Sequence, residues 1–232
     1  MTAHHPLLHF DRAYVWEAES GKLVTRNLVA KGPIVALSFS PDRKLLAAAA
    51  LQEGPAGGVG RVWRLSDRKL LYAVDIDDGY GFGDAIAFTP DGKLFATGGG
   101  TGFVKFWDAR TGQPAGRPAL AVAGWVQSID FDRTGRLMVT AGTDGTTRLF
   151  DVKARAQLGT PLPGLDNVGA NAAFTPDGSA VVSVYERTGA AFMHDLRPTA
   201  WQTRACSVAG RTLTRDEWAL YLPDRKFNPA CA

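Results

Sequence analysis

The chain has 232 residues, a formal net charge of +3, 45% hydrophobic residues and 21% charged residues. This composition is that of an ordinary soluble globular protein, and its length allows one large all-β domain or two small ones. No stretch approaches 18 apolar residues, and the N-terminus lacks a basic segment followed by an apolar one. We therefore expect a cytoplasmic protein with no membrane-spanning helix, and the scattered Lys and Arg residues argue against nucleic-acid binding.

Two markers recur along the chain with the same period. The first is a Phe followed by a Pro-Asp-Gly-like turn, with Phe spacings of 49, 43 and 43 residues: Phe39–Arg43, Phe88–Gly92, Phe131–Gly135 and Phe174–Gly178. The second is an aromatic position spaced by 47, 44, 43 and 44 residues: Trp16, Trp63, Trp107, Phe150 and His194. A period of about 43 residues is what a four-stranded repeat unit requires.

Alternating apolar and polar residues and turn residues predict short strands within each unit. In chain order we expect strands over 7–10, 13–18 and 22–29, then 34–39, 45–50, 61–65 and 69–76, then 85–88, 93–98, 103–109 and 113–123, then 128–131, 136–141, 146–152 and 157–165, then 170–174, 180–185 and 190–195. Three units are therefore complete, whereas the first lacks its inner strand and the last lacks its outer strand. The outer strands of the third and fourth units contain prolines, which an edge position tolerates.

Residues 102–109 (Gly-Phe-Val-Lys-Phe-Trp-Asp-Ala) resemble the end of a WD repeat, and the similarity extends over about residues 7 to 196. The resemblance implies an all-β protein, a β-propeller of four-stranded WD-type blades with three full and two partial blades. Only one unit ends in a true Trp-Asp pair, and the Gly-His pair that usually opens a repeat is absent. The hydrogen-bonded Asp-His-Ser/Thr-Trp tetrad of the family is therefore not carried over to this chain.

We expect two regions, the propeller blades over residues 1–197 and a helical tail over residues 198–232 that packs on the propeller. Incomplete end units favour the C-terminal part of a longer propeller. A compact five-blade ring and a ring completed by a second chain are the alternatives.

In the tail, Thr199–Gln202 and Thr214–Glu217 have the spacing of helix capping boxes, with Gly210 ending the first helix and Pro223 the second. The stretch from Arg204 to Cys231 looks like the tail that closes WD-repeat regions of large bacterial signalling proteins, many of which carry a STAND-type NTPase, a caspase-like peptidase or a kinase. Cys206 and Cys231 are interpreted as small residues that hold the tail down. A redox pair or half of a metal site is the alternative.

We expect no catalytic, cofactor-binding or metal-binding residues. Residues 75–79 lack the Gly and Glu positions of a calcium loop, and the Gly-rich residues 98–102 lack the Lys-Ser/Thr of a phosphate loop. Loops that are longer than the scaffold needs, or that carry aromatic residues, are the best candidates for contact with a partner. The candidate partner-binding residues are Gln52, Glu53, Tyr80, Phe82 and Trp125.

The sequence thus predicts a non-catalytic scaffold or sensor module of a bacterial signalling system that binds a protein or peptide. One alternative is a propeller enzyme with a channel site, for which Asp84 and Asn171 are the only hints. The other is an architectural module that regulates an upstream effector domain.

Overall fold

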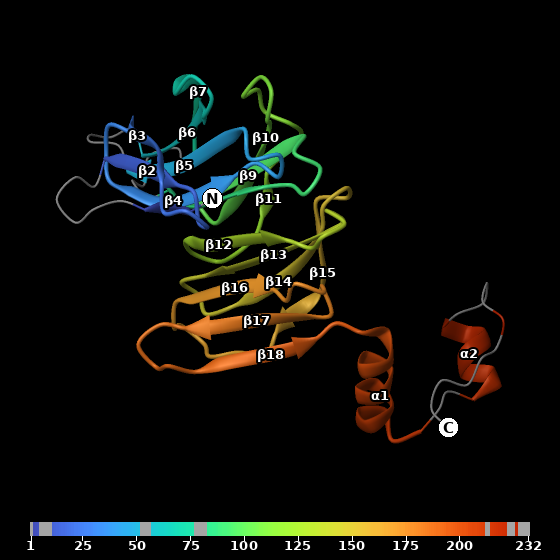
Figure 1. The fold of residues 1–232 in the computed structure, drawn as a ribbon. Coiled ribbons are helices and arrows are strands. Elements are labelled where there is room, and N and C mark those ends of the chain that lie inside the picture. The colour runs from blue at the N-terminus through green and yellow to red at the C-terminus, as the bar shows by residue number, and fades with distance from the viewer. Residues whose placement is uncertain are drawn as a thin grey trace.

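The computed structural model describes residues 2–4, 11–51, 57–76, 83–211, 214–221 and 226. These residues form five antiparallel sheets, which we number as blades 1 to 5, followed by two helices (Figure 1). Blades 2, 3 and 4 have four strands each, and blades 1 and 5 have three. The predicted arrangement of three full units between two partial ones is confirmed.

The strands follow one another along the chain in the order of the blades. Blade 1 contains β1 (Thr2–His4), β2 (Arg12–Trp16) and β3 (Leu23–Val29). Blade 2 contains β4 (Ile34–Phe39), β5 (Leu45–Leu51), β6 (Gly58–Arg64) and β7 (Lys69–Asp75). Blade 3 contains β8 (Gly83–Phe88), β9 (Leu94–Gly99), β10 (Phe103–Asp108) and β11 (Ala119–Leu120). Blade 4 contains β12 (Val126–Phe131), β13 (Leu137–Gly142), β14 (Thr147–Asp151) and β15 (Ala156–Leu162), and blade 5 contains β16 (Ala170–Phe174), β17 (Ala180–Tyr185) and β18 (Ala191–Asp195).

The repeated turn after each inner strand is closed by side chains, as the Pro-Asp pattern predicts. In blade 5, Asp177 Oδ1 accepts the Ser179 N–H at 3.0 Å and the Thr175 hydroxyl at 2.6 Å. Asp42 and Asp91 accept the same two kinds of donor in blades 2 and 3. In blade 4 the carboxylate and the hydroxyl exchange positions, and Asp132 accepts the Leu137 N–H at 2.7 Å. A local hydrogen bond therefore ends every inner strand sharply.

Side chains alternate between the two faces of each blade, and the core lies between neighbouring blades. In blade 4, Met138 pairs with Phe150 and faces blade 3, whereas Val139 pairs with Leu149 and faces blade 5. The aromatic position that recurs along the sequence packs between blades, as at Trp63, which is 3% exposed and packs among residues of blades 1 and 2.

The inner strands β4, β8, β12 and β16 lie side by side along this row of blades. Blade 1 and blade 5 lie at its opposite ends (Figure 1). The described residues therefore form an open row of blades, not the compact five-blade ring considered as one alternative.

One strand differs from the sequence prediction, and another is not tested. The strand expected over 7–10 lies outside the described residues, and β1, at residues 2–4, pairs with β2. The outer strand of blade 3 was expected over 113–123, but β11 has two residues and a single further bridge joins Trp107 to Pro114. Pro114 and Pro118 explain this break, because proline has no N–H to donate to a strand ladder.

Two helices follow, α1 (Pro198–Ala209) and α2 (Arg215–Tyr221), and both lie to one side of the blades (Figure 1). The capping box of α2 is confirmed, because Thr214 Oγ1 accepts the Glu217 N–H and Glu217 accepts the Thr214 N–H. The predicted Thr199 cap is wrong: α1 begins at Pro198 after Arg197, with no side-chain cap. A proline at the first helical position presets its backbone angle and starts the helix two residues earlier than a Thr199 cap would. Gly210 ends α1 at φ 67°, as expected.

Cys206 is disulfide-bonded, and Cys231, the other cysteine of the chain, lies outside the described residues. Packing of the tail on the blades stays a prediction. In the part of the chain that the structure describes, no helix is long and apolar enough to cross a membrane.

Candidate binding face around Trp125

Of the five candidate partner-binding residues, the structure describes Trp125. Gln52, Glu53, Tyr80 and Phe82 lie outside the described residues. Consecutive strands of a blade run in opposite directions, so β5 and β7, which precede those four residues, end on the same side of the row as the segment that carries Trp125. We call this side of the row the Trp125 face.

The backbone of Trp125 is held by the turn between β13 and β14. The Trp125 N–H donates to Thr143 Oγ1 at 2.9 Å, and the Thr143 N–H donates to the Trp125 carbonyl at 3.0 Å. Gly142 allows this approach, since a Cβ there would lie 2.3 Å from the Trp125 carbonyl oxygen. Trp125 therefore has a fixed backbone although its side chain is 39% exposed.

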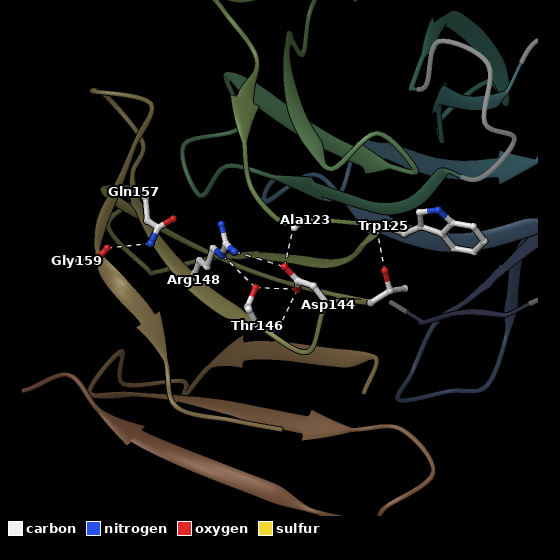
Figure 2. Close-up of polar contacts among 8 residues, drawn as sticks. Ala123, Trp125, Asp144, Thr146, Arg148, Gln157 and Gly159 are labelled. Atoms are coloured by element: carbon white, nitrogen blue, oxygen red, sulfur yellow. Dashed lines mark hydrogen bonds and ion pairs between the residues drawn. The ribbon is translucent and has the colours of Figure 1, made fainter. Parts of the chain in front are cut away.

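Asp144 is the centre of the polar cluster next to Trp125 (Figure 2). Its Oδ2 accepts the Ala123 N–H at 2.8 Å, and its Oδ1 accepts the N–H and the hydroxyl of Thr146 at 2.9 and 2.8 Å. Arg148 Nη2 lies 3.4 Å from Oδ2, and the two side chains are 19% and 11% exposed. This carboxylate joins the connection before β12 to the β13–β14 turn, and so it fixes the segment that presents Trp125.

Figure 2 shows the Trp125 indole pointing away from Asp144, so the ring does not belong to the polar cluster. On the same face, Gln127 Nε2 donates to Glu186 Oε1 at 2.9 Å and joins blade 4 to blade 5. Glu186 is exposed. The face thus offers an exposed aromatic side chain on a fixed backbone and an exposed carboxylate, and these groups suit contact with a polypeptide.

Asp130 is a carboxylate of the inner strands that the sequence analysis did not single out. Its Oδ2 accepts the Phe174 N–H of β16 at 2.8 Å, and its Oδ1 accepts the Phe131 N–H at 2.9 Å. Burial raises the pKa of Asp130, while these backbone hydrogen bonds act in the opposite direction. Ser128 similarly accepts the Ala172 N–H at 2.8 Å. Both side chains bind the backbone of the next blade, a structural use that leaves no oxygen of Asp130 without a donor.

Of the two residues considered as hints of a channel enzyme, the structure describes the side chain of Asn171, which is exposed on β16. The side chain of Asp84 lies outside the described part of the chain. Ser183 and His194 do form a pair, with 3.1 Å between Oγ and Nε2, but Ser183 is fully buried and cannot reach a substrate. His194 stacks on Phe192, and burial lowers the pKa of its imidazole. Within the described ranges, no group of three or more His, Cys, Asp or Glu side chains could hold a metal ion.

Part of this chain is similar to a known class of repeat, the WD repeat. A family model described as "WD domain, G-beta repeat" matches residues 84–108 and 121–151, which lie in blades 3 and 4. An uncharacterized WD repeat-containing protein from Nostoc sp. is 64% identical over 28 residues, which are 12% of this chain and 2% of that protein. The matched part is thus a small fraction of that relative's length. WD repeats typically act as non-catalytic modules that mediate protein–protein interaction.

Proposed function

We propose that this protein is a non-catalytic scaffold or sensor module that binds a protein or peptide through the Trp125 face. The observation that carries the proposal is the exposed Trp125 side chain on a backbone held by Thr143 and Asp144. Exposed Trp residues contribute strongly to protein interfaces, and a rigid backbone lowers the entropy lost on binding. Gln52, Glu53, Tyr80 and Phe82 are the further contacts that we propose on this face.

We further propose that the module acts in the cytoplasm of a bacterium as part of a signalling system, next to an effector domain such as an NTPase, a peptidase or a kinase. The support is the likeness of residues 204–231 to the tails of such proteins. The Trp125 face would then recruit the signal or the target, and the chemistry would belong to the effector.

The proposal is tested by photo-crosslinking in the cells that produce the protein. A photoreactive phenylalanine is introduced at Trp125 and, as a matched control, at Leu158, which is 41% exposed on β15. The protein captured from position 125 is identified and purified, and its affinity is measured for the native chain, for Trp125→Ala and for Leu158→Ala.

We expect Trp125→Ala to weaken binding by about 30-fold or more, since a central Trp contributes about 2 kcal/mol or more to an interface. Leu158→Ala should change the affinity by less than about twofold. Equal effects of the two variants, or capture of the same proteins from both positions, would show that the Trp125 face is not the binding surface.

A further inference from the structure

Glu186 is an exposed carboxylate of the Trp125 face, in the turn between β17 and β18. Its backbone N–H donates to the Gly169 carbonyl at 2.8 Å, and its Oε1 accepts Gln127 Nε2 at 2.9 Å. The first bond ties the turn to the segment before β16, and the second ties it to β12 of blade 4. Two bonds thus hold a surface carboxylate that would otherwise sample many rotamers, while no hydrogen bond to its Oε2 comes from the described residues.

Gln127 is directed at Glu186 by an irregularity of β12. The register of the β12–β13 pair shifts between Val126 and Ser128, and so Gln127 is the extra residue of a β-bulge. A bulge re-aims a side chain, and bulges are frequent beside functional sites. An ionised Glu186 accepts hydrogen bonds but cannot donate one, so the Gln127 nitrogen must face it and the amide oxygen must face elsewhere.

Gly169 brings the remaining oxygens of both side chains together. A Cβ on Gly169 would lie 2.8 Å from Gln127 Oε1 and 2.9 Å from Glu186 Oε2. Both oxygens are acceptors, and Gln127 Oε1 is buried with no hydrogen-bond partner. Arg187, the basic neighbour in the chain, is exposed, and in the described ranges no ion pair joins it to Glu186. The Gln127–Glu186 pair therefore concentrates negative potential at Glu186 Oε2 without a donor or a cation to balance it.

A ligand for the Gln127–Glu186 pair must supply an N–H donor and a positive charge. One carboxylate gives the pair a single negative charge, which suits a singly charged cation. Arginine binds best to both oxygens of a carboxylate at once, but Oε1 of Glu186 is already bonded to Gln127. The compact ammonium group of lysine needs one free oxygen. The geometry thus favours lysine over arginine.

We propose that Glu186 binds the ammonium group of a lysine in the partner polypeptide, with Gln127 as the positioning residue. The proposal rests on the proposed function, because the lysine belongs to the polypeptide that contacts the Trp125 face. Trp125 precedes Gln127 by two residues on the segment that leads into β12, and so one short stretch of the partner spans both groups. An ion pair that is already fixed on one side loses less side-chain entropy than a pair of two mobile side chains.

The test is an NMR titration of the native chain with the tripeptide acetyl-Ala-Lys-Ala-amide, followed at the backbone amide signal of residue 186. The titration extends to about 50 mM, because a single side chain binds weakly. Counterparts with arginine or norleucine in place of lysine test the shape and the charge of the group, and methylammonium tests whether a free amine is the ligand.

The variants are Glu186→Gln, Gln127→Met and Gly169→Ala. Glu19→Gln, at an exposed carboxylate of the β2–β3 turn, is the matched control. Circular dichroism and thermal unfolding confirm that each variant is folded.

We expect the native chain and Glu19→Gln to bind the lysine tripeptide equally, and Glu186→Gln to bind it at least about tenfold more weakly. Gln127→Met and Gly169→Ala should weaken binding at least about threefold, because they release Glu186 or displace its Oε2. The arginine tripeptide and methylammonium should bind at least about threefold more weakly than the lysine tripeptide, and the norleucine tripeptide at least about tenfold more weakly.

An unchanged affinity in folded Glu186→Gln would overturn the proposal, as would equal binding of the norleucine tripeptide. Equal or tighter binding of the arginine tripeptide or of methylammonium would overturn the assignment to lysine. The partner captured at Trp125 separates this proposal from the proposed function. If its affinity falls in Trp125→Ala but not in Glu186→Gln, the lysine site is wrong and the proposed function stands. If the lysine tripeptide binds at Glu186 and position 125 captures no partner, the lysine site stands and the proposed function fails.

Discussion

Thr97 and Thr140 occupy the same position in blades 3 and 4, and both side chains are fully buried. Trp107 Nε1 donates to Thr97 Oγ1 at 2.8 Å. In blade 4 the aromatic position holds Phe150, which has no N–H, and Thr140 Oγ1 has no hydrogen-bond partner among the described residues. The same substitution, Thr to Val, should therefore have opposite effects at the two positions.

Thr97→Val keeps the shape of the side chain but leaves a buried indole N–H without an acceptor, which costs about 1–3 kcal/mol. Thr140→Val removes a buried hydroxyl that has no partner, so it should leave the free energy of unfolding unchanged or raise it by up to about 1 kcal/mol. The free energies of unfolding of the two variants should therefore differ by about 1–4 kcal/mol.

The assay is equilibrium unfolding in guanidinium chloride, followed by Trp fluorescence and by circular dichroism so that two-state behaviour is checked. Trp107→Phe provides a second check, because it removes the indole N–H. In that background Thr97→Val should lower the free energy of unfolding only slightly. Equal destabilisation by Thr97→Val and Thr140→Val, or an undiminished cost in the Trp107→Phe background, would refute the reasoning.

Three further predictions concern the turns between strands, the hydrogen bonds of Asp144 and the effect of pH. Arg43 has φ 58° where the equivalent turns have Gly92 and Gly178. Arg43→Gly should therefore raise the free energy of unfolding by about 0.5–1 kcal/mol, whereas Gly178→Ala should lower it by about 1 kcal/mol. Changes of the same sign for both variants in guanidinium unfolding would contradict this. Asp144→Ala should lower the free energy of unfolding by about 2–4 kcal/mol, because it leaves two N–H groups and Arg148 without their carboxylate. Asp144→Asn should lower it less. A loss below about 1 kcal/mol for Asp144→Ala in the same assay would show that the Asp144 hydrogen bonds do not fix this segment. Hydrogen bonds from Thr175 and Ser179 hold the pKa of Asp177 well below its usual range, and Arg64 lowers the pKa of Asp67 to about 2. A carboxyl with a lowered folded-state pKa stabilises the fold above its unfolded pKa, and this stabilisation is lost as the pH falls. The melting temperature should therefore be maintained above about pH 5 and fall between about pH 4 and 2. In Asp177→Asn it should fall less steeply.

The sequence predicts the blades well because their signals are local. The Phe and turn pattern locates the inner strands to within one or two residues, as at Ile34–Phe39 and Ala170–Phe174. The hydrogen bonds that end these strands join residues two to five positions apart, so the residue types alone reveal them. The start of α1 is also local, but there proline at Pro198 and a Thr-x-x-Gln spacing compete, and the proline decides.

The features that the sequence analysis missed depend on neighbours in space. Asp130 binds Phe174, 44 residues away, and no pattern within one repeat distinguishes it from an exposed carboxylate. Gly142 is needed because the Trp125 carbonyl approaches it, which follows from the packing of the β13–β14 turn on the segment before β12. The sequence analysis named Trp125 as a candidate contact residue, whereas the hydrogen bonds that hold its backbone to Thr143 follow only from the structure.

The aromatic position of the third strand shows how one repeat position takes different roles. The ring nitrogens of Trp107 and His194 both form a hydrogen bond with a buried hydroxyl of the neighbouring strand, at Thr97 and Ser183. The imidazole of His194 therefore makes the same contact as the indole of Trp107. One contact of the family tetrad, between Trp and Ser/Thr, is therefore present in blade 3, although we expected the tetrad to be absent. Blade 4 lacks this bond, and its aromatic position is filled by Phe150, which is buried against blade 3. In blades 3 to 5 the buried hydroxyl next to this position therefore has a hydrogen-bond partner where the ring carries a nitrogen, at Trp107 and His194, and has none beside Phe150.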